Sequence, residues 1–231
     1  MIPAEKVIVA LDTQDPEQVK KILDALKGYK VWVKIGMELF YSLGPQVIQE
    51  AKDRDLKVFL DLKLHDIPTT VSHALQALMK HPVDMVNVHA AGGSEMLKMA
   101  SSVVKSSVHK PLLIAVTQLT STTQSQVNDE QHITGSLEES VVHYAQLARM
   151  SGCDGVVCAP QEVIAIKKIC SPEFITVTPG IRPLGTSMND QKRVTTPMDA
   201  LRLGTDYMVI GRPITQNPSP LVALVSILKG S

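Results

Sequence analysis

The sequence predicts an α/β protein that folds as a single (β/α)8 TIM barrel over residues 1–231. Two observations predict this fold. Short segments rich in Val and Ile recur eight times along the chain, and segments with the apolar spacing of helices lie between them. Strands that are apolar on both faces are typical of parallel sheets covered by helices. Strict alternation of strand and helix predicts right-handed crossovers, and eight such units close into a barrel.

The eight expected strands are mostly apolar and bounded by polar residues. They cover residues 7–12, 31–36, 58–63, 85–90, 112–118, 155–160, 174–180 and 207–212. An open, doubly wound sheet is the alternative arrangement of the same units. Against it, the first strand is not followed by the Gly-x-Gly-x-x-Gly motif that is typical of dinucleotide-binding sheets.

Helical spacing is clearest over residues 16–26, 68–80, 94–105 and 136–150. Asp15 before Pro16 predicts an N-cap followed by proline at the first helical position. Ser136 and Glu139 have the spacing of a capping box. The longest polar stretches, 119–135 and 182–197, follow the fifth and seventh strands, on the barrel face that carries active sites. Loops of this length are usually functional.

Composition excludes several classes of protein. The 23 Lys and Arg residues balance the 23 Asp and Glu residues, so the net charge gives no reason to expect nucleic acid or an acidic membrane as a partner. Aromatic residues make up only 3%, which argues against base stacking on an aromatic platform. Three cysteines without Cys-x-x-Cys spacing argue against a disulfide framework or a zinc site. With no signal peptide and no apolar run of membrane length, we expect a cytoplasmic protein.

Charged residues at the ends of the expected strands are the most informative feature. In a closed barrel they converge on one mouth, because the first, second, third and eighth strands are neighbours there. A network of structural ion pairs is the alternative interpretation, but stability rarely requires so many charges at this face. The residues concerned are Asp12, Lys34, Asp61, Lys63, Asp66, His89 and Arg212.

The segment Asp-Leu-Lys-Leu-His-Asp, residues 61–66, is the sharpest local feature. On an extended strand, Asp61 and Lys63 point to the same face. Nearby carboxylates keep a lysine protonated, which makes Lys63 a poor Schiff-base nucleophile and a good proton donor to a carbanion. A carboxylate beside an anionic substrate group would also repel that group. The combination suits loss of carbon dioxide followed by protonation.

Two further segments predict a phosphate site. Gly211 before Arg212 lets the backbone approach an anion, and the guanidinium adds a bidentate contact. The loops after strands seven and eight are the usual phosphate site of such barrels. In the loop 177–193, Arg182 and Gln191 flank a glycine-containing stretch that could close over the phosphate. An ordinary turn and a surface loop remain the alternatives.

Over essentially its full length, the chain resembles a known family, the orotidine 5′-monophosphate decarboxylases of the bacterial type. The Asp-x-Lys-x-x-Asp segment followed by Ile-Pro is very specific to this family. The other matching segments are moderately specific one by one and are strong evidence together. The matching segments, in the order and spacing of the family, are residues 9–12, 33–36, 61–71, 86–93, 115–121, 155–160, 177–183, 190–193 and 206–215.

The resemblance implies an enzyme that converts orotidine 5′-monophosphate to uridine 5′-monophosphate, the last step of de novo pyrimidine nucleotide biosynthesis, without a metal or an organic cofactor. It implies that Lys63 protonates C6 within a charge array that Lys34, Asp61 and Asp66 complete. It also implies a homodimer, in which Asp66 and Thr70 come from the neighbouring subunit. The remaining implied contacts are Asp12 and Lys34 on the ribose, Thr120 by the pyrimidine, and Arg182, Gln191, Gly211 and Arg212 on the phosphate.

The chain departs from the family at two positions: Thr69 stands where Asn is usual, and Leu64 where Phe is commoner. Two other functions remain as alternatives. One is a magnesium-dependent sugar-phosphate decarboxylase or aldolase of the 3-keto-L-gulonate 6-phosphate decarboxylase type, which a magnesium requirement would favour. The other is a non-catalytic phosphate-binding barrel, which tight nucleotide binding without turnover would favour.

Overall fold

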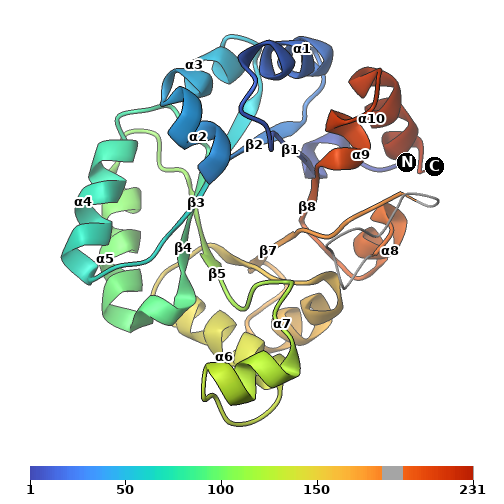
Figure 1. Ribbon diagram of the computed structural model, residues 1–231. Helices are drawn as coiled ribbons and strands as arrows, with labels where there is room; N and C mark the ends of the chain where they lie inside the picture. Colours follow the sequence, from blue (N-terminus) through green and yellow to red (C-terminus); the bar gives the residue numbers. More distant parts are fainter. Residues whose placement is uncertain (184–194, 231) are drawn as a thin grey trace.

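The structure, a computed structural model, describes residues 1–183 and 195–230. Within these residues, eight parallel strands form a closed barrel in the order β1 to β8, so the barrel prediction is confirmed and the open sheet is excluded. Figure 1 shows the strands around the centre and the helices around them. The strands are Val7–Ala10 (β1), Trp32–Gly36 (β2), Lys57–Leu64 (β3), Met85–His89 (β4), Leu112–Val116 (β5), Gly155–Val157 (β6), Ile175–Thr178 (β7) and Tyr207–Ile210 (β8).

The helices lie between the strands, with extra short helices beside the mouth and before β1 (Figure 1). The longer ones are Pro16–Leu26 (α1), Pro68–Leu78 (α4), Gly93–Ser106 (α5), Leu137–Met150 (α6) and Pro220–Lys229 (α10). The shorter ones are Met37–Leu43 (α2), Gln46–Lys52 (α3), Val163–Ile169 (α7), Pro197–Arg202 (α8) and Arg212–Thr215 (α9). The 3-10 turns Ala4–Lys6, Ala90–Gly92 and Pro160–Glu162 and the π-helical turn Gln126–Glu130 complete the elements.

Local capping begins two of these helices as predicted. The Asp15 side chain accepts a hydrogen bond from the Glu17 amide at 3.0 Å, and Pro16 opens α1. Ser136 and Glu139 form the reciprocal capping box of α6. Each cap satisfies amide groups that the first turn of a helix leaves without a partner, which fixes where the chain leaves the preceding loop.

Side chains alternate along each strand between the barrel interior and the helical layer. In β3, Val58 and Leu60 pack in the cluster between barrel and helices, while Phe59 belongs to a second, smaller cluster. That second cluster fills the barrel interior and consists of Ile8, Trp32, Phe59, Met85, Ile114 and Val177, with partly buried neighbours. The interior is therefore a packed floor, and positions that follow in the same inward register reach the mouth above it.

Three aspartates fasten the opposite end of the barrel. We name Asp84, Asp154 and Asp206 the basal aspartates, because each comes directly before an even-numbered strand. Each carboxylate accepts the amide of the second residue of the preceding strand, at 2.7 Å from Val58, 2.8 Å from Leu113 and 2.8 Å from Thr176. These bonds satisfy backbone groups at the strand starts, away from the mouth.

The two ends of the described chain lie side by side (Figure 1), and the Ile2 amide donates to the Leu228 carbonyl at 2.8 Å. Among the described residues, the helices are all too short or too polar to cross a membrane.

Candidate active site

A cavity of about 430 Å³ opens at the carboxyl ends of the strands. That volume is in the range of sites for small-molecule ligands. Its floor includes Phe59 from the interior cluster, and its walls carry both signs of charge. Residues predicted from the sequence that line it are Asp12, Lys34, Asp61, Lys63, Thr120, Arg182, Gly211 and Arg212.

Four of these residues form alternating ion pairs, and we name Asp12, Lys34, Asp61 and Lys63 the charge cluster. Lys34 Nζ lies 3.0 Å from Asp12 Oδ1 and 3.3 Å from Asp61 Oδ2. Lys63 Nζ lies 2.7 Å from Asp61 Oδ1. The predicted convergence of strand-end charges is thus seen for these four residues, which lie in β2 and β3 and just after β1.

The charge cluster favours the ionised forms of its two most buried members, Asp61 and Lys34. Burial alone would raise the pKa of Asp61, but Lys34 and Lys63 outweigh it and lower the pKa below its ordinary value. Burial alone would lower the pKa of Lys34, but Asp61 and Asp12 outweigh it and raise the pKa. The cavity therefore presents fixed charges, which can stabilise charge that develops on a bound molecule.

Lys63 occupies an irregular part of β3. Leu60 pairs with Val86 and Leu64 with Val88, so the ladder with β4 shifts register between them. Lys63 itself has φ of 49°, a left-handed conformation that is uncommon outside glycine. Its side chain is 28% exposed and lies at the cavity wall. The irregularity thus determines where the ammonium group points, as β-bulges beside active sites often do.

The chain as a whole is also similar in sequence to a known family. Residues 5–227 match the sequence model of the family described as "Orotidine 5'-phosphate decarboxylase / HUMPS family". The chain belongs to this family.

Relatives with this name cover nearly the whole chain. It is 51% identical over 218 residues to the orotidine 5'-phosphate decarboxylase of Staphylococcus saprophyticus, covering 94% of each chain. It is 52% identical over 217 residues to that of Streptococcus thermophilus, covering 94% of this chain and 93% of the relative. The crystal structure of orotidine 5'-phosphate decarboxylase from Lactobacillus acidophilus superposes with a TM-score of 0.84 at 40% identity, covering 96% of this chain and 97% of that one.

The phosphate residues expected from the decarboxylase family lie together where they are described. Arg182 is buried after β7, Gly211 and Arg212 follow β8, and all three line the cavity. Between β7 and Arg182, Gly180 has a positive φ of 78°. Gln191 lies outside the described residues. Thr120, expected by the pyrimidine, lines the cavity from the loop after β5.

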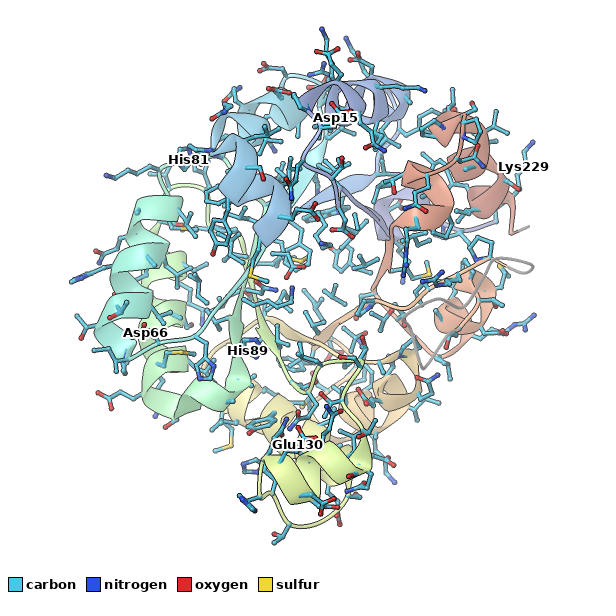
Figure 2. All side chains as sticks on the ribbon, viewed as in Figure 1. Asp15, Asp66, His81, His89, Glu130 and Lys229 are labelled. Atoms are coloured by element: carbon cyan, nitrogen blue, oxygen red, sulfur yellow. The ribbon has the colours of Figure 1, made fainter. Side chains whose placement is uncertain are left out.

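Two expected residues of the decarboxylase family lie elsewhere. Asp66 and Thr70 are exposed, and both are missing from the described lining of the cavity. Figure 2 shows Asp66 beside the start of α4, toward the outer side of the ring. The Asp66 carboxylate accepts the Ile67 amide at 2.6 Å. Within one chain, Asp66 is therefore not part of the charge cluster.

Sequence reasoning missed two polar residues of the inward register. Asn87 in β4 is 2% exposed and contacts both Asp61 and the Lys63 backbone. Gln118 lines the cavity, and its side chain donates to Gln131 at 2.9 Å and to Ser140 at 3.1 Å. A signal was present: Asn87 is a neutral amide at an inward position of the otherwise apolar β4, and Gln118 is one that follows β5 by two residues.

The histidine at the end of β4 stands next to this site without joining it. His89 is the last residue of β4, and its ring lies 5.4 Å from that of His65. Burial, His65 and Lys63 together lower the pKa of His89, which keeps the ring neutral at neutral pH. Among the described residues, the structure has no group of three or more His, Cys, Asp or Glu residues suited to a metal ion.

Proposed function

We propose that this protein decarboxylates orotidine 5′-monophosphate to uridine 5′-monophosphate, the last step of de novo pyrimidine nucleotide biosynthesis. The observation that carries the proposal is the charge cluster, set in a cavity that also holds Arg182, Gly211 and Arg212, in a chain of this decarboxylase family.

We place the enzyme in the cytoplasm, because its three cysteines are buried free thiols, as a reducing compartment allows. Residues 1–231 act as one catalytic domain.

Lys63 is the proton donor in this mechanism. The bond between C6 and the carboxylate breaks, carbon dioxide leaves, and the electron pair stays on C6. The Lys63 ammonium delivers a proton to that carbon, becomes a neutral amine and regains its proton from solvent. In the resting site the Lys63 side chain forms an ion pair with Asp61, whose carboxylate oxygen lies 2.7 Å from Nζ. The same ammonium charge stabilises the developing carbanion before the proton moves.

Asp61 and Lys34 prepare the site for that step. The ionised Asp61 carboxylate lies beside the position of the departing carboxylate and disfavours the bound ground state. Lys34, held between Asp12 and Asp61 at 3.0 and 3.3 Å, presents its ammonium to the ribose together with the Asp12 carboxylate. Thr120 contacts the pyrimidine from the loop after β5.

The phosphate binds where the cavity is cationic. Arg182 and Arg212 line the side of the cavity after β7 and β8, and the missing side chain of Gly211 lets the backbone approach the anion. Gln191 completes this site. The phosphate is remote from C6, but its binding energy orders the substrate against the charge cluster.

We also propose that the enzyme is a homodimer in which each chain gives Asp66 and Thr70 to its partner's site. The support is that both residues are exposed and lie off the lining of their own cavity. Ile67, next to Asp66, exposes 66% of its surface. A large exposed apolar side chain beside an exposed carboxylate suits burial against a second copy.

The first experiment follows the absorbance of orotidine 5′-monophosphate in buffer with chelator and no added metal. The wild type is expected to turn over rapidly, whereas Lys63→Ala is expected to lose several orders of magnitude in kcat. This loss exceeds the roughly 10²- to 10⁴-fold rate enhancement that a general acid alone contributes, because the ammonium charge is lost as well. Lys98→Ala, at an exposed position on α5, is the matched control with normal kcat. Near-normal turnover by Lys63→Ala would refute the mechanism, and turnover that requires magnesium would refute the metal-free reaction.

Mixing two inactive variants tests the shared site. In a mixed dimer of Lys63→Ala with Asp66→Ala, one of the two sites regains an intact Lys63 and an intact Asp66. After exchange of subunits, activity is expected to return to about a quarter of the wild-type value. If the mixture stays inactive although mixed dimers form, Asp66 does not act across an interface.

A further inference from the structure

The hydrogen-bonded pairing between β3 and β4 is interrupted by a bulge in β3, and one residue of β4 faces this bulge. Between the pairs Leu60–Val86 and Leu64–Val88, three residues of β3 face a single residue of β4. Those three include Asp61 and Lys63, and the single residue is Asn87. Because the strands cannot pair by their backbones across this gap, the polar groups of the bulge need other partners.

The Asn87 side chain supplies those partners. Its Oδ1 accepts the Lys63 amide at 2.8 Å, and its Nδ2 donates to Asp61 Oδ1 at 2.7 Å. The first bond requires an acceptor and the second a donor, so the two bonds together fix the orientation of the carboxamide. The group is buried, which makes exchange of these bonds for bonds to water costly.

Both contacts of Asn87 converge on the proton donor. Asp61 Oδ1, which accepts from Asn87, is the oxygen that also accepts from Lys63 Nζ at 2.7 Å. The Lys63 backbone, which donates to Asn87, has the left-handed φ of 49° that turns the side chain toward the cavity. A single carboxamide therefore connects the main chain of Lys63 with the carboxylate that holds its ammonium.

We propose that Asn87 is a positioning residue, which fixes the Lys63 bulge and the Asp61 carboxylate so that the Lys63 ammonium meets the reacting carbon. The proposal rests on the role proposed above for Lys63. It makes Asn87 part of the catalytic geometry, although Asn87 is not among the residues found to line the cavity. The competing view is that Asn87 only satisfies buried backbone groups and affects stability alone.

Asn87→Ala and Asp84→Ala form a matched pair of variants. Asp84 precedes the same strand, and its carboxylate accepts the Val58 amide at 2.7 Å and Lys52 Nζ at 2.8 Å, at the end remote from the site. Both variants are expected to lower Tm. Only Asn87→Ala is expected to lower kcat, by about 10²-fold, the scale of a misplaced catalytic group. Its KM for substrate and its inhibition constant for uridine 5′-monophosphate stay within a few-fold of wild type.

Asn87→Asp provides a readout that a purely structural role does not move. A protonated carboxyl group can accept from the Lys63 amide and donate to Asp61, as the carboxamide does, whereas an ionised one repels Asp61. Beside a second carboxylate, this carboxyl titrates above the ordinary range. Its charged neighbours are Asp61 and Lys63, with Lys34 beyond Asp61 and His89 two residues along β4. We expect kcat relative to wild type to rise as pH falls, at temperatures where circular dichroism shows folded protein.

The outcomes separate this proposal from the one on which it rests. If Lys63→Ala keeps near-normal turnover, the proposed role of Lys63 is wrong. If Lys63→Ala is inactive but Asn87→Ala keeps kcat within about threefold of Asp84→Ala, Asn87 does not position Lys63 and the inference fails. Should Asn87→Ala not fold, Asn87→Asp decides alone: a kcat ratio to wild type that is flat with pH overturns the inference.

Discussion

Replacing Asp61 by Asn tests how far the charge cluster stabilises the fold. The variant keeps the shape of the side chain but leaves two ammonium groups, at 2.7 and 3.3 Å, without their shared carboxylate. Removing one partner of a buried ion pair costs about 3–5 kcal/mol. The lower end applies here, because Lys63 is partly screened by solvent and Lys34 keeps Asp12, whose side chain is 57% exposed. For a chain of this length, about 3 kcal/mol corresponds to a loss of roughly 6–12 °C in Tm.

The pH dependence of that loss follows from the pKa shifts. The pKa of Asp61 is lowered in the folded protein, so its contribution to stability is complete above the unfolded value of about 3.9 and is lost as pH falls through the lower, folded value. The pKa of Lys34 is raised, so its contribution is complete below about 10.4 and is lost at higher pH. Between about pH 5 and 9, the difference between wild type and variant is expected to stay constant.

Thermal and urea unfolding followed by circular dichroism measure this difference. Lys63→Met is the companion variant, because it leaves Asp61 with Lys34 and Asn87 and should destabilise less. Two results would contradict this reasoning. One is an Asp61→Asn variant as stable as the wild type at pH 7, and the other is a loss of unfolding free energy that grows as pH falls toward 3. Either would show that the charge cluster does not stabilise the fold.

Three other perturbations follow from the structure. Arg212→Ala should weaken substrate binding by about 2–5 kcal/mol, seen as a raised KM, and the effect should vanish with the nucleoside orotidine, which lacks the phosphate. In Lys63→Met, the His89 pKa should rise in an NMR titration, because the Lys63 charge is one cause of its depression; an unchanged pKa would mean that the Lys63 ammonium does not act on it. Gly155→Ala places a methyl group on the Ile175 carbonyl and should cost about 1–3 kcal/mol or more in unfolding free energy, with normal kcat for the folded fraction.

The fold was predictable because its signals are local and repeated. Strands apolar on both faces, helical spacing between them, and caps such as Asp15 and Ser136 all indicate the same architecture, and the barrel confirms it. The convergence of Asp12, Lys34, Asp61 and Lys63 was predictable as well, since inward positions at adjacent strand ends must meet once the barrel closes.

The rest of the site depends on information that residue types do not carry. Nothing in a lysine indicates a φ of 49°, and the bulge that produces it arises from the register of β3 against β4. Asn87 could have been found from the alternation Met85, Asn87, His89, but only after that register was known. The placement of Asp66 outside its own cavity depends on the path of the chain after β3, which the motif itself does not determine.

The side chains of the basal aspartates join six strands of the barrel in three pairs. Each joins an odd-numbered strand to the next even one, β3 to β4, β5 to β6 and β7 to β8, through a carboxylate at the strand start. The corresponding position before β2 is Val31, so β1 and β2 lack such a carboxylate. The amide protons of Val58, Leu113 and Thr176 should therefore exchange faster with solvent when Asp84, Asp154 and Asp206 are replaced by Ala. The barrel would then loosen from its base while the mouth keeps its form.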